Sequence, residues 1–196
     1  MTSILRRLAA LAVLVAWAGT ASAHSGHTEA SSFIAGFIHP LGGLDHLLAM
    51  VTVGLWSAMA FPAGRRWRGP LAFVLTVLAG ASLGMVGVTV PMLEAVLAGS
   101  VVLLGLMLVG PARTAGVAGT LLIAAVGLAH GLAHGAEVPA SASFAGYAIG
   151  FIVCTALLQG AGVAGGALLR TVKASAWQLL SAGVTLAGLG LLAARI

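Results

Sequence analysis

The stretch "GFIHPLGGLDHLLAM", residues 36–50, places two histidines and an aspartate inside a run that is otherwise apolar enough for a lipid bilayer. An ionisable side chain at mid-membrane costs about 2.5 to 3.5 kcal/mol on insertion scales. Such side chains persist where the protein gives them a partner or a task. We therefore expect His39, Asp45 and His46 to hold a ligand.

The composition of the chain indicates a membrane protein. Of its 196 residues, 60% are hydrophobic and 7% are charged, which excludes a soluble domain of this length. The formal net charge of +5 does not indicate nucleic-acid binding, because the basic residues form short clusters between apolar stretches. We expect an all-α integral membrane protein that contacts the lipid bilayer and no nucleic acid.

The first 23 residues have the parts of a cleavable signal peptide. Arg6 and Arg7 form its basic region, residues 8–18 form its apolar region, and "TASA" supplies the small residues that a signal peptidase reads. Cleavage is predicted before His24, which leaves residues 24–196 as the mature chain. The alternative is an uncleaved anchor helix.

The mature chain contains six apolar stretches, each near the ~20 residues that cross ~30 Å of hydrocarbon. They predict a bundle of six transmembrane helices at about residues 41–60, 71–88, 90–109, 117–136, 144–165 and 175–194. Pairs of small residues four apart, such as Gly80 and Gly84, are expected to let helices pack closely.

The distribution of basic residues predicts the orientation of this bundle. With the mature N-terminus outside, only Arg195 among the basic residues of the mature chain lies on the outer side, as the positive-inside rule requires. Those on the cytoplasmic side are Arg65, Arg66, Arg68, Arg113, Arg170 and Lys173. We therefore expect a protein of the bacterial inner membrane with both termini of the mature chain in the periplasm.

The histidines and carboxylates gather on the outer side of this predicted bundle. At ~1.5 Å per residue, Asp45, His46, Glu94 and His130 lie about 6 to 9 Å below the outer surface. His39, His134 and Glu137 lie nearer to that surface. Pro40 and the pair Gly42-Gly43 are expected to interrupt the helix, which is tolerated at this depth where the chain lines a cavity.

The stretch "HGLAHGAE", residues 130–137, places further ligand side chains on one helix face. His130 and Glu137 are two turns apart, and His134 is only ~40° away from them around the helix. Imidazoles and carboxylates without thiolates suit Ni²⁺, Co²⁺ or Zn²⁺. The alternative is that these histidines only form hydrogen bonds to backbone groups between helices.

Two of these motifs carry a resemblance to a known family. "HPLGGLDH" resembles the HPxxGxDH signature of the HupE/UreJ family, small membrane proteins encoded with hydrogenase or urease systems and regarded as nickel permeases. "HGLAHG" is similar to a later span of the same family. His39, Asp45 and His46 are also loosely similar to a motif of the nickel/cobalt transporter family, although here five residues, not four, separate His39 from Asp45.

The resemblance implies a permease, not an enzyme, that takes up nickel from the periplasm for hydrogenase or urease maturation. Cobalt is a second possible cargo, and cytoplasmic nickel chaperones are the implied partners. The implied metal ligands are His39, Asp45, His46, His130 and His134, with Glu94 as a further ligand or charge partner. Glu137, His24 and His27 would recruit metal. Nothing in the sequence orders the two N-terminal histidines, which favours their alternative interpretation as part of a solvated tail.

Two other functions are compatible with the same residues. In an intramembrane zinc hydrolase, the histidines and Asp45 would hold a metal-activated water, with Glu94 as the general base. A metal sensor would bind the ion without transporting it. The sequence contains no "GxxxxGK[ST]" motif, so we expect transport that does not use ATP hydrolysis by this chain.

Overall fold

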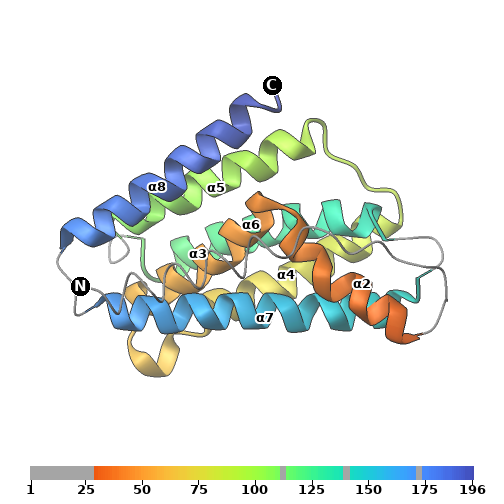
Figure 1. Ribbon diagram of the computed structural model, residues 1–196, viewed down its shortest axis with the longest axis horizontal. Coiled ribbons are helices and arrows are strands. Elements are labelled where there is room, and N and C mark those ends of the chain that lie inside the picture. Colours follow the sequence, from red (N-terminus) through yellow and green to blue (C-terminus); the bar gives the residue numbers. More distant parts are fainter. Residues whose placement is uncertain (1–28, 111–113, 139–141, 171–173) are drawn as a thin grey trace, which may run out of the picture.

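The computed structural model describes residues 29–110, 114–138, 142–170 and 174–196, and the regular structure of these ranges is entirely helical (Figure 1). In chain order the elements are α2 (Glu29–Gly42), α3 (Leu44–Ala60), the short 3₁₀ helix η1 (Ala63–Arg65), α4 (Arg68–Met85), α5 (Leu93–Val109), α6 (Val117–Ala136), α7 (Phe144–Leu169) and α8 (Ala174–Ala193). The all-α fold class is confirmed. The predicted signal peptide, His24 and His27 lie outside the described residues.

The helix bounds follow the apolar stretches of the sequence. Helix α6 has the bounds predicted for the fourth span, and the largest difference is at the end of α7, at Leu169 instead of residue 165. By length and composition, four of the described helices can cross a membrane, and the bent pair α2 and α3 makes a fifth if it is one span. Helix α5 has only 17 residues, so a sixth span remains a prediction.

Helix α2 has no counterpart among the predicted spans. It meets α3 at Gly43 with a bend of 85°, which makes a broken span or a re-entrant segment. Gly43 has an extended backbone with φ −113° and ψ 125°, and Pro40, inside α2, lacks the N–H that a regular helix needs. The interruption expected in this region is therefore present. It turns α2 back so that His39 and His46 face each other, with ring centroids 6.1 Å apart.

The helices pack mainly in pairs. Helix α4 lies along α6, α3 along α7, α5 along α8, and α2 along the first part of α7. Figure 1 shows α5 and α8 as one pair that crosses the layer formed by the other helices. Helix α3 contacts several of the others and contributes the fully buried side chains of Met50 and Trp56 to the core. Helix α3 is consequently held from several sides.

Glycines permit the closest of these contacts. A Cβ atom at Gly80 of α4 would overlap the carbonyl of Leu128 in α6, and one at Gly131 of α6 would overlap the carbonyl of Val77 in α4. The close packing expected at Gly80 and Gly84 is therefore present, against the residues on either side of His130 and His134. This contact sets the position of the histidines of α6 relative to the bundle.

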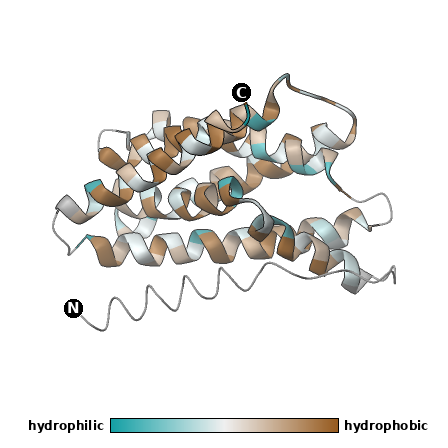
Figure 2. Ribbon diagram, turned by 45° about the horizontal axis from the view of Figure 1, so that its top comes forward, coloured by the Kyte–Doolittle hydropathy of each residue, from teal (hydrophilic) through white to brown (hydrophobic). Residues whose placement is uncertain are grey.

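The histidines and most of the arginines of the described residues lie at opposite ends of the bundle. Figure 2 shows apolar residues along most of the helix lengths. One end, here called the histidine end, carries His39, His46, His130 and His134. The other end, here called the arginine end, carries Arg65, Arg66, Arg68 and Arg170. Helices α4 and α6 run parallel, because Phe73 lies beside Gly127 and Ala81 lies beside Gly135, and Arg68 at the start of α4 is therefore far from His134 near the end of α6.

Candidate metal centre

The first turn of α3 positions His46 through Asp45. Asp45 Oδ1 accepts hydrogen bonds from the His46 backbone N–H at 2.9 Å and from His46 Nδ1 at 2.6 Å. A Cβ atom at Gly43 would lie only 2.7 Å from Asp45 Oδ1 and 2.6 Å from His46 Nδ1, so the absence of a side chain there leaves room for this arrangement. Because a carboxylate only accepts hydrogen bonds, Nδ1 carries the proton and Nε2 of His46 keeps its lone pair.

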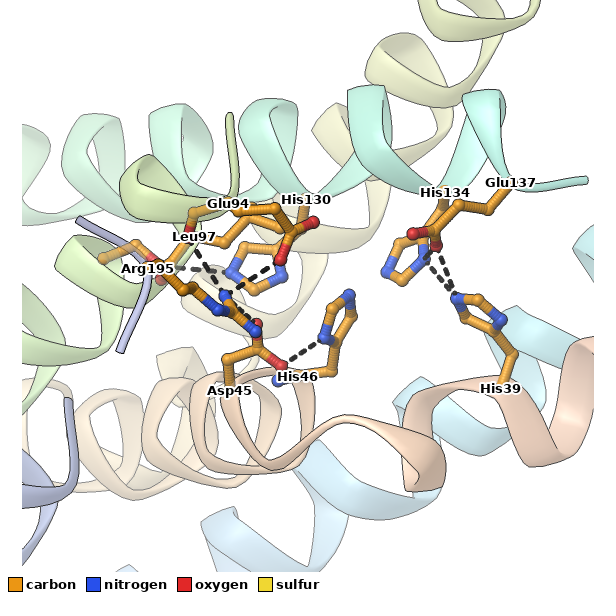
Figure 3. Close-up of polar contacts among 10 residues, drawn as sticks. His39, Asp45, His46, Glu94, Leu97, His130, His134, Glu137 and Arg195 are labelled. Atoms are coloured by element: carbon orange, nitrogen blue, oxygen red, sulfur yellow. Dashed lines mark hydrogen bonds and ion pairs between the residues drawn. The ribbon is translucent and has the colours of Figure 1, made fainter. Parts of the chain in front are cut away.

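Arg195 balances the charge of Asp45. Its Nη1 lies 2.8 Å from Asp45 Oδ2 and 3.1 Å from Glu94 Oε2, and it also donates to the backbone carbonyl of Glu94 at 3.0 Å. Asp45 is 1% exposed, whereas the Glu94 side chain is 58% exposed. Both oxygens of Asp45 are thus engaged by protein groups, and Glu94 faces Arg195 rather than a histidine (Figure 3).

A second group of side chains converges from α2 and the end of α6. His134 Nδ1 lies 2.8 Å from His39 Nε2, which in turn lies 3.1 Å from Glu137 Oε2. Figure 3 shows the His39 and His134 rings facing each other, with the Glu137 carboxylate beside them. His134 is buried, the Glu137 side chain is 47% exposed, and the centre is therefore reached from the histidine end.

These two groups meet to form a possible metal site. His39, His46 and His134 each offer a ring nitrogen, and these three nitrogens lie within 4.8 Å of one another. Nitrogens that share an ion at ~2.1 Å are about 3 to 4 Å apart, so a small movement of the rings would suffice. His46 Nε2 and His134 Nε2 are buried and have no hydrogen-bond partner among the described residues. The donor set fits a borderline divalent ion.

His130 lies next to the three histidines, but its hydrogen bond is with Ser100 of α5. It is fully buried, and its Nε2 lies 3.1 Å from the hydroxyl of Ser100 on α5. The Ser100 hydroxyl also donates to the Leu97 carbonyl at 2.6 Å, so it acts as an acceptor toward His130. The His130 ring centroid is 5.1 Å from that of His46. His130 therefore supports the wall of the site from behind His46.

Helix α7 closes the other side of the site with two aromatic rings. The ring of Phe151 lies with its centroid 4.4 Å from that of His134, and the ring of Tyr147 lies 5.7 Å from that of His39. The Tyr147 hydroxyl is buried and has no hydrogen-bond partner among the described residues. These rings limit the movement of the imidazoles and exclude lipid from the site.

Glu137 follows the last residue of α6 and carries a perturbed carboxyl group. The hydrogen bond from His39 holds the pKa of Glu137 below its usual value, against the opposing effect of partial burial. The group is therefore ionised at neutral pH. A carboxylate at the exposed rim can attract a cation to the imidazoles behind it.

The sequence-predicted residues thus divide into two sets. The structure brings His39, His46 and His134 together as possible ligands, with Glu137 in contact with two of them. It places Asp45, Glu94 and His130 around them, in contact with protein groups. Arg195 was not predicted as part of the site. The sequence did single it out in one respect, because Arg195 alone among the arginines and lysines of the mature chain is predicted to lie on the outer side.

Comparison with known proteins places the chain in a family. The family model described as "HupE / UreJ protein" matches residues 11–191. The chain is also 37% identical over 194 residues to "Protein HupE" of Rhizobium leguminosarum bv. viciae, an alignment that covers 97% of each protein. No solved structure matches the chain significantly. The chain belongs to the HupE/UreJ family.

Proposed function

We propose that this protein is a permease that takes up Ni²⁺, with Co²⁺ as a second cargo, through the site at the histidine end. The observation that carries the proposal is the convergence of three ring nitrogens from three different helices, α2, α3 and α6, within 4.8 Å. Membership of the HupE/UreJ family supports the same function. Zn²⁺ fits the same donor set and is the competing ion.

In this proposal His39, His46 and His134 bind the ion directly. Asp45 orients His46 and raises the basicity of its free nitrogen, which is the usual task of a carboxylate behind a metal-bound histidine. Arg195 supplies the counter-charge of Asp45 and holds it in place, and His130 and Glu94 contribute through these neighbours. Glu137 recruits the ion at the rim, and His24 and His27 would extend this recruitment.

We further propose that the histidine end faces the periplasm of a bacterial inner membrane. The basic residues of the arginine end would then lie in the cytoplasm, as the positive-inside rule requires, and the chain would cross the membrane six times after removal of residues 1–23. Delivery to nickel chaperones of hydrogenase or urease assembly would follow on the cytoplasmic side. The sequence contains no "GxxxxGK[ST]" motif, so the proposed uptake does not use ATP hydrolysis by this chain.

The zinc hydrolase alternative is not supported. Its proposed general base, Glu94, lies 3.1 Å from Arg195 and forms no hydrogen bond or ion pair with His39, His46 or His134 among the described residues. The Glu94 carboxylate faces Arg195 and is not in position to accept a proton from a water held among these imidazoles. Membership of the HupE/UreJ family does not favour a hydrolase either.

Accumulation of radioactive nickel by cells that lack other nickel importers tests the proposal. Cells that express the wild-type protein should accumulate nickel above the empty-vector level, and His46→Ala should reduce the difference at least about tenfold at equal amounts of protein in the membrane. Ser181→Ala, a buried change in α8 away from the site, is the matched control. Wild-type protein that is inserted and binds nickel but gives no accumulation would contradict the proposal.

A further inference from the structure

Three polar atoms in the middle of α7 have no hydrogen-bond partner among the described residues. They are Thr155 Oγ1 and both amide atoms of Gln159, and these residues are 1% and 0% exposed. Burial of an unpaired hydroxyl or amide costs roughly 1 to 3 kcal/mol each in proteins. Inside a membrane, polar side chains in such positions mark pathways for substrates or ions.

Other buried polar side chains far from the metal site do have partners. Ser181 donates to the Gly105 carbonyl at 2.7 Å, and Trp56 Nε1 donates to Thr114 at 2.8 Å. The remaining unpartnered buried atoms of the described residues belong to the site itself: His46 Nε2, His130 Nδ1, His134 Nε2 and Tyr147 Oη. Thr155 and Gln159 therefore share with the metal site a property that the rest of the described core lacks.

The position of these two residues continues the site into the bundle. Thr155 and Gln159 follow Phe151 at four-residue intervals, so the three lie along one face of α7. The Phe151 ring contacts the His134 ring, and Gln159, eight residues later, lies ~12 Å further along the helix.

The packing of α3 against α7 gives the same depth for Gln159 independently. A Cβ atom at Gly54 would overlap the carbonyl of Gln159, so these two residues lie at the same level. Gly54 follows His46 by eight residues, which is again ~12 Å. Helix α7 continues for ten residues, or ~15 Å, from Gln159 to Leu169 at the arginine end. Gln159 thus lies about halfway between the metal site and that end.

We propose that Thr155 and Gln159 form a second binding site for the partly hydrated divalent ion, here called the inner polar site, on its path from the three histidines toward the arginine end. This inference rests on the proposed transport function. Hydroxyl and amide oxygens are neutral and bind a borderline ion more weakly than imidazole does. An ion can therefore leave the inner polar site, and transport requires sites that bind well enough to admit an ion and weakly enough to release it.

Measurements of nickel uptake and of nickel binding distinguish the role of the inner polar site from that of the metal site. Gln159→Leu and Thr155→Val keep the approximate volume and remove the polar atoms, so nickel accumulation should fall at least about tenfold. Calorimetry on the purified variants should give unchanged nickel affinity at the three histidines. Gln159→Asn retains an amide and should keep more uptake than Gln159→Leu, and Ser181→Ala should keep all of it.

Thiol labelling tests the water access of the inner polar site without any transport. In a Cys154→Ser background, Gln159→Cys should react with a small water-soluble methanethiosulfonate, read by mass spectrometry. Leu157→Cys on the same helix is the control, because Leu157 is 61% exposed on the outside of the bundle and would face lipid. A thiol in water ionises and reacts, whereas one in hydrocarbon does not.

Three results would overturn the inference: full uptake by Gln159→Leu and Thr155→Val, loss of nickel binding in parallel with uptake, or an unreactive Gln159→Cys. Failure of the wild-type protein to accumulate nickel would instead contradict the proposed function. The thiol reaction distinguishes the two cases because it does not depend on transport.

Discussion

Arg195 and Asp45 lie 150 positions apart in the chain and meet at the histidine end, where Arg195 Nη1 donates to Asp45 Oδ2 at 2.8 Å. The contact ties the end of α8 to the first turn of α3. Because the other Asp45 oxygen holds His46, the C-terminal arginine acts on a metal-binding ring through one intermediate side chain. The relationship explains why a basic residue is placed at this end of the bundle.

Removal of the Arg195 guanidinium should destabilise the protein. Arg195→Gln leaves the Asp45 carboxylate buried without its counter-charge, and breaking a buried pair from one side costs about 3 kcal/mol at the lower end of the known range. The lower end applies because the Arg195 side chain is 25% exposed. Thermal unfolding in detergent micelles, followed by circular dichroism, should show this loss. Arg195→Lys keeps the charge and should lose less stability than Arg195→Gln. An unchanged melting temperature for both variants would contradict the role of the pair.

Loss of the Asp45 charge should weaken nickel binding without abolishing it. Asp45→Asn can still accept a hydrogen bond from His46 but no longer raises its basicity, and such changes behind a metal-bound histidine cost about 10- to 100-fold in affinity. His46→Ala removes a proposed ligand and should cost more. Calorimetry on both variants decides the order. A larger loss for Asp45→Asn than for His46→Ala would indicate that Asp45 binds the ion itself.

Much of the fold follows from the sequence because lipid imposes simple rules on it. A chain in hydrocarbon must satisfy its backbone hydrogen bonds internally, so long apolar stretches predict helices and their bounds, as α6 illustrates. Helix α2 was missed because its first turn, "EASS", is polar and the helix is only 14 residues long. No periodicity in the sequence distinguishes a short helix that folds back along α7 from a tail.

The candidate metal site could also be predicted only in part from the sequence. Residue types and their depth brought His39, His46 and His134 into one predicted group, and the structure places their ring nitrogens together. The sequence could not separate them from Asp45, because an aspartate beside a histidine can bind an ion or orient its neighbour. That choice depends on Arg195, which reaches Asp45 only through the packing of α8. Long-range packing leaves no local pattern in the sequence.

Nickel affinity should fall by at least about tenfold between pH 7 and pH 5, because imidazole binds a metal ion only when it is neutral. Glu137 should not contribute to this loss. Its pKa is lowered by the hydrogen bond from His39, so its ionised form stabilises the folded state above the unfolded pKa, and that stabilisation is lost only as the pH falls through the lower folded value. Calorimetry at pH 7, 6 and 5 measures the affinity. A constant affinity across this range would exclude the histidines as ligands.

The orientation of the bundle can be tested with single cysteines in a Cys154→Ser background. Thr89→Cys, in the exposed connection between α4 and α5 at the histidine end, should react with a membrane-impermeant thiol reagent on intact cells. Arg65→Cys, at the arginine end, is similarly exposed to solvent or headgroups and should react only after the membrane is opened. The opposite pattern would reverse the proposed direction of entry.

The packing of α4 against α6 should control the metal site from a distance. A methyl group at Gly80 would overlap the Leu128 carbonyl and approach Gly131, which lies beside His130. Gly80→Ala must therefore push α6 away, and overpacking of this kind costs about 1 to 3 kcal/mol. The displacement should also lower nickel affinity, because His134 is carried by α6 whereas His39 and His46 are not.

Gly99→Ala in α5 is the matched control for this change. Nothing lies within 4 Å of a Cβ atom built at Gly99, so the added methyl group meets no other helix. Alanine is also the better helix former, and the variant should unfold at the wild-type temperature or slightly above it. Calorimetry and thermal unfolding on both variants give the comparison. If Gly80→Ala bound nickel as Gly99→Ala does while melting lower, the spacing of α4 and α6 would stabilise the fold without positioning His134.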